Sequence, residues 1–235
     1  MKTNTLVILS LPFQRLIRSH LSPMVLELLT QRADVAVVSP FADRPAFVQQ
    51  YKHPCIHHVP GPVQMDISWL ARKMLPVSSI LRMEGYWFRH KREIPFYWAN
   101  RHVRFGEDGN DRRLTLPYRI VLDILSWIGY FPYAWRLIES LYGGWCYVLP
   151  DLTALSVRYQ KVVLIQASSW GYQDAVLAWH GRKHKWRTVM LPYTTDQLFC
   201  NGYLYSDYDI VCVQGQAENQ WAIDYHKLSP DRIIK

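Results

Sequence analysis

Short runs of apolar residues, many of them β-branched, recur along the chain and are separated by segments of helical character. The clearest runs cover residues 5–11, 34–39, 161–166, 187–191 and 209–213. Successive positions in these runs are apolar and do not alternate with polar ones, so both faces of each predicted strand are expected to be buried. Strands of this kind form parallel sheets that helices cover on both sides. The pattern therefore predicts an α/β fold.

Amphipathic segments between the runs predict the connecting helices. Residues 23–32 and 216–227 carry apolar side chains at helical spacing. After the strand at 161–166, Ser168 or Ser169 is expected to cap a helix that ends at Gly181. Strand, helix and strand in this order predict right-handed βαβ units. The expected fold is a Rossmann-like parallel sheet with helices on both faces.

A long segment interrupts this rhythm. Residues 55–59 predict one more short strand, and about a hundred residues then precede the strand at 161. Residues 63–160 have a largely helical character, so we predict a helical insertion within a single domain that spans residues 1–235. Residues 232–235 predict a strand that is only beginning, and we therefore expect this domain to be the N-terminal lobe of a longer, two-lobed chain.

The composition adds positive charge and many aromatic rings to this picture. The chain has 27 Lys and Arg against 19 Asp and Glu, with ten Trp and fifteen Tyr. Such a surface suits nucleic acid, an anionic membrane, or a phosphorylated or sugar substrate. The four cysteines form no C-x-x-C pair, which argues against a zinc or redox motif and favours a reducing cytoplasm. The first apolar run lacks a cleavage site and is followed by Arg15 and Arg18, so it is interpreted as a strand and not a signal peptide.

The loops after the strands are the expected binding site, because ligands of open parallel sheets bind beyond the carboxyl ends of the strands. The loop at 192–197 combines hydroxyls, a carboxylate and an aromatic ring, a set that suits a sugar. Asp196 is the candidate general base for an acceptor hydroxyl. In the alternative interpretation, Thr195 or Asp196 only caps a turn. The candidate acceptor-binding residues in these loops are Gln14, Ser168, Ser169, Trp170, Tyr193, Thr194, Thr195, Gln214 and Gln216.

Several known motifs are missing or misplaced. The sequence has neither a G-x-G-x-x-G turn after the first strand nor a P-loop, and it lacks the G-x-S-x-G elbow of hydrolases. Asp207 and Asp209 have the spacing of a D-x-D metal motif but precede a strand, so we predict a turn or strand-entry role and no metal site. The adjacent His57 and His58 would point to opposite faces of a strand, which indicates edge or surface positions.

Basic and aromatic residues interleave between Arg82 and Arg104. This pattern suits single-stranded nucleic acid or the headgroup zone of a membrane. We favour an anionic membrane surface and consider nucleic acid an unlikely partner, because residues 120–128 are apolar enough to lie on a bilayer and no RNA-binding signature is present. A solvated face beside a partly buried helix is the remaining alternative. The candidate membrane-contact residues are Arg89, Lys91, Arg92 and Trp98.

The order of elements resembles the N-terminal lobe of GT-B glycosyltransferases, in which two Rossmann-like lobes face a cleft. The resemblance lies in the opening strand at 5–11, in the strands at 161 and 187, and in the closing Asp209-Ile-Val-Cys-Val-Gln-Gly that precedes a helix and Arg232-Ile-Ile-Lys. The turn Leu11-Pro12-Phe13-Gln14 departs from the family, which has a glycine-rich turn there.

The resemblance implies a lobe that binds an acceptor glycan or lipid-linked glycan during cell-surface polysaccharide or lipopolysaccharide biosynthesis. It implies a cytoplasmic protein that is peripheral at the inner membrane face. It also implies no cofactor in this lobe, a nucleotide sugar donor in a C-terminal lobe, and no activity for this part alone. Two alternatives stay open: a non-catalytic Rossmann-like binding module for a phosphorylated or nucleotide ligand, and a peripheral membrane scaffold.

Overall fold

A computed structural model describes residues 4–62, 81–90, 92, 103–105, 111–113, 116–131, 134–147, 149–168, 172–194, 198, 202–204 and 207–235. Its centre is a seven-stranded parallel sheet with the order β3-β2-β1-β6-β7-β8-β9. The strands are β1 (Thr5–Ser10), β2 (Asp34–Ser39), β3 (Ile56–Pro60), β6 (Lys161–Gln166), β7 (Arg187–Met190), β8 (Ile210–Cys212) and β9 (Ile233–Ile234). The predicted α/β fold with a Rossmann-like parallel sheet is confirmed.

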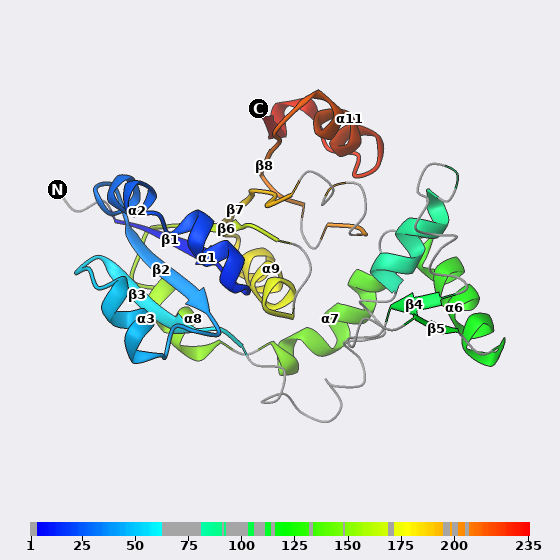
Figure 1. Cartoon of the computed structure of the whole chain (residues 1–235), viewed down its shortest axis with the longest axis horizontal. Helices are drawn as coiled ribbons and strands as arrows, with labels where there is room; N and C mark the ends of the chain where they lie inside the picture. The colour runs from blue at the N-terminus through cyan, green and yellow to red at the C-terminus, as the bar shows by residue number, and fades with distance from the viewer. Residues whose placement is uncertain are drawn as a thin grey trace.

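Helices cover both faces of the sheet (Figure 1). One face is covered by α1 (Gln14–His20), α2 (Pro23–Thr30) and α3 (Pro45–Gln50), and the other by α8 (Pro150–Ser156) and α9 (Tyr172–His184). The strands alternate between these two cores: Leu6 and Ile8 of β1 face α8 and α9, whereas Val7 and Leu9 face the helices of the first group. A third core lies between β7, β8 and α11 (Gln216–Asp224).

The prediction that Gly181 ends the helix after β6 was wrong, because α9 continues to His184. A Cβ at Gly181 would lie 3.2 Å from Thr188 Cγ2 and 3.3 Å from Leu164 Cδ2. The glycine therefore lets α9 lie close against β6 and β7. The helix stops where Lys185 adopts a φ of 55°, in the left-handed region that commonly follows a helix.

The described part of the segment between β3 and β6 is largely helical, as predicted. It contains a helix through 81–89, α6 (Leu116–Gly129), α7 (Ala134–Cys146) and α8. It also contains an antiparallel pair of short strands, β4 (Val103–Phe105) and β5 (Asp111–Arg113), which the sequence did not predict. Figure 1 shows α6, β4 and β5 at the opposite end of the molecule from β3 and α3, with α7 between them.

Small residues fix the packing of α6 on the helix at 81–89. A Cβ at Gly85 would lie 2.1 Å from the carbonyl of Gly129, and a Cβ at Gly129 would lie 2.3 Å from the carbonyl oxygen of Leu81. Real Cβ atoms do not approach backbone this closely, so only glycine at both positions allows the two helix backbones to touch. Among the described residues, no helix has the length and apolar character needed to cross a membrane.

Candidate functional site

The chain changes direction across the sheet between β1 and β6. Strands β2 and β3 extend the sheet on one side of β1, and after the insertion the chain returns to β6 and extends it on the other side. The two central strands pair directly, and their last residues, Ser10 and Gln166, are register partners. A crevice at the carboxyl ends of such a strand pair is where doubly wound sheets bind ligands.

A buried carboxylate joins the ends of these two strands. The Ser10 hydroxyl donates a 2.9 Å hydrogen bond to Oδ1 of Asp174, and the Ser168 hydroxyl donates to Oδ2. Asp174 lies in the first turn of α9 and is fully buried. Both serine hydroxyls are buried, so these hydrogen bonds satisfy polar groups that cannot reach water. Asp174 therefore joins three segments: the end of β1, Ser168 just after β6, and the start of α9.

Two glutamines extend this arrangement to further strands. The amide of Gln173 donates to Ser10 Oγ at 3.1 Å and to the carbonyl of Val38 in β2 at 2.8 Å. Gln166 donates to the backbone carbonyl of Asp174 at 2.9 Å and accepts a 2.9 Å hydrogen bond from the Tyr208 hydroxyl. We call this buried set the crevice floor. Its members are Ser10, Gln166, Ser168, Gln173 and Asp174.

Several predicted binding residues lie in loops at the same end of the sheet as this floor. The loop after β7 is tied to the end of β6, since Tyr193 N–H donates to the carbonyl of Ala167 at 3.1 Å. The side chains of Tyr193 and Thr194 are exposed. Gln214 is also exposed and lies near this loop, with its amide 3.5 Å from the carbonyl of Pro192. The structure thus brings the loops after β6, β7 and β8 together.

Three more of the predicted acceptor-binding residues lie in the described part of the chain. Gln14 and Gln216 are exposed first residues of α1 and α11, each directly after the loop that follows its strand. Ser168 belongs to the crevice floor. Six of the predicted site residues lie outside the described residues: Ser169, Trp170, Thr195, Asp196, Lys91 and Trp98.

Sequence reasoning missed the floor residues Ser10, Gln173 and Asp174. Ser10 is the only polar residue between Thr5 and Pro12, and Asp174 is an acidic residue in a predicted first helical turn. Both signals are ordinary in isolation, because acidic residues are common at helix N-termini. Their joint role is evident only in the folded structure, where Ser10 and Asp174 form a hydrogen bond although they are 164 positions apart in the sequence.

Within the D-x-D segment, Asp209 has the strand-entry role that the sequence predicted, whereas Asp207 forms an ion pair that was not predicted. Asp207 forms two 2.8 Å hydrogen bonds with the Arg136 guanidinium, and these hold the pKa of this carboxyl below its usual value. Asp209 Oδ2 accepts the backbone N–H of Thr188 at 2.7 Å, at the entry to β7 and β8. No group of three or more His, Cys, Asp or Glu side chains that would hold a metal ion is found in the part of the chain that the structure describes.

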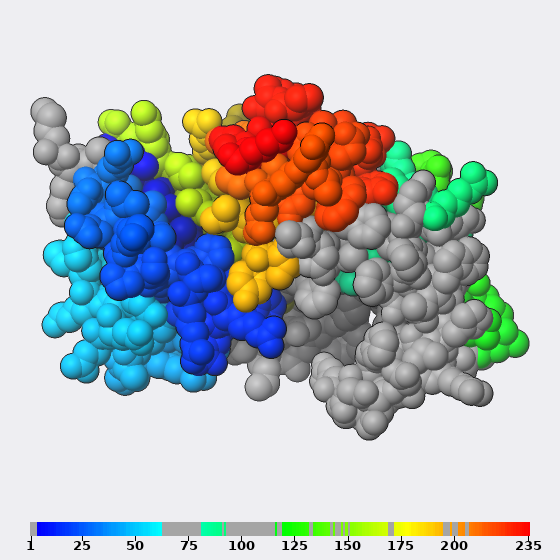
Figure 2. Space-filling model, turned by 45° about the horizontal axis from the view of Figure 1, so that its top comes forward, coloured from blue at the N-terminus to red at the C-terminus, as the bar shows by residue number. Residues whose placement is uncertain are grey.

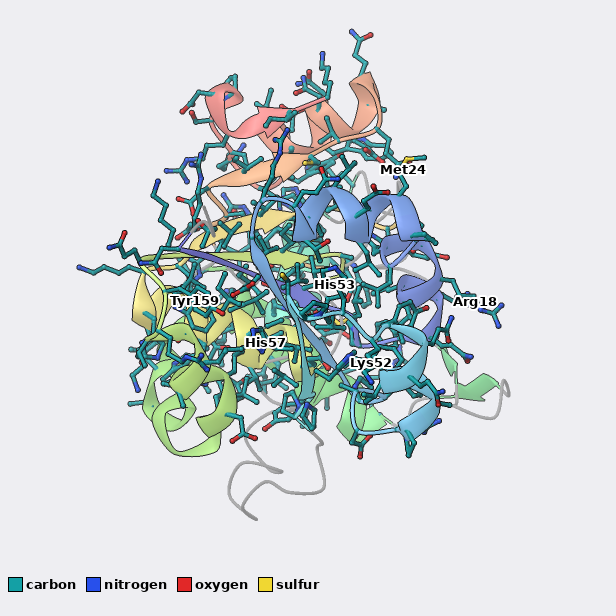
Figure 3. The ribbon with its side chains drawn as sticks, turned by 90° about the vertical axis from the view of Figure 1, so that its left-hand side faces the viewer. Arg18, Met24, Lys52, His53, His57 and Tyr159 are labelled. Atoms are coloured by element: carbon teal, nitrogen blue, oxygen red, sulfur yellow. The ribbon has the colours of Figure 1, made fainter. Side chains whose placement is uncertain are left out.

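His57 lies on β3, which is the edge strand that was predicted for it. Its Nε2 is 3.3 Å from the hydroxyl of Tyr159, which donates a 2.6 Å hydrogen bond to Asp34 (Figure 3). Burial, followed by the bond to Asp34, raises the pKa of Tyr159 to about 12. Asp34 begins β2, so this cluster lies at the amino end of the strands, away from the crevice.

The buried Glu139 and the half-buried Arg182 form an ion pair away from the carboxyl ends of the strands. The Arg182 guanidinium donates to the Glu139 carboxylate, and burial raises the pKa of Glu139 to about 7 although Arg182 and Arg136 oppose this shift. Arg182 lies in the last turn of α9, at the other end of this helix from Asp174. The pair therefore attaches α7 to α9 and takes no part in the crevice.

A cavity of about 120 Å³ lies beside α7 and the end of α11. Cationic and aromatic side chains line it, among them Arg89, Arg136, Lys227, Tyr203 and Tyr225. His226 also lines the cavity, and its Nε2 donates to the Leu198 carbonyl at 2.7 Å; burial lowers the pKa of His226 to about 4. An oxygen atom of a backbone carbonyl can only accept, so the neutral imidazole carries its proton on Nε2.

Comparisons of the chain with protein-family models, with curated proteins and with solved structures found no match. The candidate site therefore depends on its geometry alone.

Proposed function

We propose that this chain is the acceptor-binding, N-terminal lobe of a GT-B-like glycosyltransferase that acts in cell-surface polysaccharide or lipopolysaccharide biosynthesis. The observation that supports this best is the buried polar set at the carboxyl ends of β1 and β6, together with exposed Tyr193, Thr194 and Gln214 in the loops after the neighbouring strands. A sugar presents an apolar ring face and a border of hydroxyls. An aromatic ring beside hydroxyl and amide groups matches both features.

In this proposal the rim of the crevice holds the acceptor glycan. The ring of Tyr193 stacks on a sugar face, while Thr194 and Gln214 bond its hydroxyls. Gln14 and Gln216 extend this contact on either side, and Ser169, Trp170 and Thr195 complete it. The floor contributes rigidity, because Ser168 and its neighbours already bond to one another.

Transfer requires a nucleotide sugar, which we assign to a second lobe. Asp196 removes the proton of the acceptor hydroxyl while the oxygen of that hydroxyl attacks the anomeric carbon of the donor sugar. The nucleoside diphosphate leaves with the electron pair of the broken bond. The lobe described here binds an acceptor and carries out no transfer by itself.

Saturation-transfer NMR of the chain with lipopolysaccharide-core oligosaccharides tests the acceptor site. Tyr193→Ala should weaken binding about tenfold, which corresponds to about 1.4 kcal/mol. Tyr130→Ala is the matched control, because Tyr130 is exposed to a similar extent, 42% against 37%, and lies next to α6. Equal binding by both variants, or no binding by the unchanged chain, would overturn the acceptor assignment.

A separate observation supports a second candidate function. The cavity lined by Arg89, Arg136 and Lys227 carries three cationic groups, and Asp207 neutralises one of them. This arrangement favours a phosphorylated or nucleotide ligand and thus a non-catalytic binding module. Calorimetric titration with uridine diphosphate distinguishes the two. Binding that Lys227→Gln abolishes and Tyr193→Ala leaves unchanged would favour the binding module.

A further inference from the structure

One helix presents an apolar face to the surroundings. Six large apolar side chains of α6 are between 37% and 68% exposed. They recur at helical spacing and form one continuous stripe along the helix. We call this stripe the α6 outer face; its members are Leu116, Ile120, Val121, Ile124, Trp127 and Ile128. A surface helix normally turns such a stripe towards the core, so its outward position indicates a docking surface.

The packing of α6 fixes this orientation. Leu122, Ser126 and Gly129 form the buried side of the helix, and Gly129 contacts Leu81 and Gly85 of the helix at 81–89. Rotation of α6 to bury the apolar stripe would place large side chains where only glycine fits. The α6 outer face is therefore held outward by the structure itself. Figures 1 and 2 show α6 at the end of the molecule that lies farthest from β3.

Cationic groups border this face. The Arg89 guanidinium lies 5.6 Å from the centre of the Tyr130 ring, which directly follows α6. Arg119 lies on α6 directly before Ile120, and Arg92 is an exposed residue shortly after the helix at 81–89. Between Leu81 and Ile120 the sequence has nine Lys and Arg against five Asp and Glu. An apolar helical face with Trp in it and basic residues around it is typical of helices that lie in the headgroup zone of anionic membranes.

We propose that the α6 outer face docks this chain onto an anionic membrane surface, with the helix axis parallel to the bilayer plane. The 14 residues of α6 extend about 21 Å, which is less than the hydrocarbon core of about 30 Å. The positive charge around this face favours an anionic lipid surface over a second copy of the chain as its partner. A symmetric pair would bring the cationic borders of two chains with a net charge of +8 against each other. This inference goes beyond glycan binding and does not depend on it.

Vesicle flotation of the full chain tests this proposal, with phosphatidylcholine vesicles and with vesicles that contain equal amounts of phosphatidylcholine and phosphatidylglycerol. The variant combines Ile120→Gln, Ile124→Gln and Trp127→Gln, which change only exposed side chains. The matched control combines Met24→Gln and Leu28→Gln on α2, whose side chains are 72% and 55% exposed. Met24 protrudes from α2 in Figure 3.

The unchanged chain and the α2 control should float with the anionic vesicles, less so at high salt, and should bind neutral vesicles weakly. The triple variant should bind anionic vesicles at least about tenfold more weakly, because each lost apolar group removes part of the insertion energy. Three results would overturn the proposal: no binding by the unchanged chain, equal binding by the triple variant, or an unchanged chain that is dimeric by light scattering and becomes monomeric in the triple variant. Far-ultraviolet circular dichroism confirms that all variants are folded.

Discussion

The hydroxyl of Ser10 at the end of β1 donates a hydrogen bond to Asp174 in the first turn of α9, across 164 residues of sequence. The other carboxylate oxygen of Asp174 accepts from Ser168, just after β6. One buried side chain thus connects β1 and β6, the two strands at which the chain switches from one side of the sheet to the other. Because this contact is internal, its contribution to stability can be measured separately from any ligand.

Replacement of Asp174 should destabilise the fold strongly. Asp174→Ala removes two buried hydrogen bonds and leaves the hydroxyls of Ser10 and Ser168 without this acceptor, so we expect the free energy of unfolding to fall by about 3 kcal/mol or more. Urea denaturation followed by circular dichroism measures this. Asp207→Ala is the control: its ion pair with Arg136 is largely exposed, and its loss should cost less than about 1 kcal/mol. Equal losses in the two variants would contradict the role of the crevice floor.

The close contact between Gly85 and Gly129 leads us to expect that a side chain at Gly129 would destabilise the fold. Alanine is a better helix former than glycine, so Gly129→Ala would stabilise an isolated α6. In this structure the added Cβ would lie 2.3 Å from the carbonyl oxygen of Leu81, and we expect a net loss of about 2 kcal/mol. The thermal unfolding midpoint reports the difference. Gly215→Ala serves as the control, since nothing lies within 4 Å of its added Cβ, and a similar shift in both variants would rule out the close helix contact.

Asp196 is the candidate base in the proposed transfer. In the proposed two-lobed enzyme, Asp196→Asn should keep the fold and lose most of its turnover, typically by a factor of about a hundred or more, because the amide cannot accept the hydroxyl proton. Release of nucleoside diphosphate in the presence of the acceptor measures turnover. The control is Asp224→Asn, an exposed carboxylate on α11. Near-normal turnover in Asp196→Asn would leave the residue with at most a turn-capping role.

The sheet could be predicted from the sequence because its strands are buried on both faces. Strands β2 and β6 have the predicted bounds, since their apolar runs end at polar or turn residues. The short helices α1 and α3 were not predicted, because they have seven and six residues and no side-chain cap. The strand β5 was missed because its sequence, Asp-Arg-Arg, has no apolar residue to mark it.

The candidate site was predictable only where it depends on topology. The rule that ligands bind beyond strand ends placed Tyr193, Thr194 and Gln214 in neighbouring loops. The floor depends on Asp174 and Gln173, whose partners lie on strands distant in sequence, and no local pattern encodes such pairs. The orientation of α6 has the same origin: its apolar stripe is evident in the sequence, but Gly85 and Gly129 decide which side faces outward.

His226 in the cavity beside α11 should make the free energy of unfolding depend on pH. Burial lowers the pKa of His226 to about 4, whereas an unfolded histidine has a pKa of about 6.5. Between these values the unfolded chain binds more protons than the folded one, so the stability that neutral His226 contributes is complete above about pH 6.5 and is lost as the pH falls towards 4. A change from about pH 7.5 to about pH 5 should therefore cost about 2 kcal/mol through this residue.

Urea denaturation at the two pH values, with unchanged chain and His226→Gln, isolates this contribution. The glutamine amide can still donate to the Leu198 carbonyl but does not titrate, so the variant should lose about 2 kcal/mol less stability than the unchanged chain. His180, whose pKa burial also lowers to about 4, is present in both and cancels in the comparison. The control His53→Asn changes an exposed histidine and keeps an acceptor for the Cys55 N–H. If His226→Gln and the unchanged chain depend equally on pH, then His226 takes up a proton without loss of the fold, and the cavity wall must be open to water.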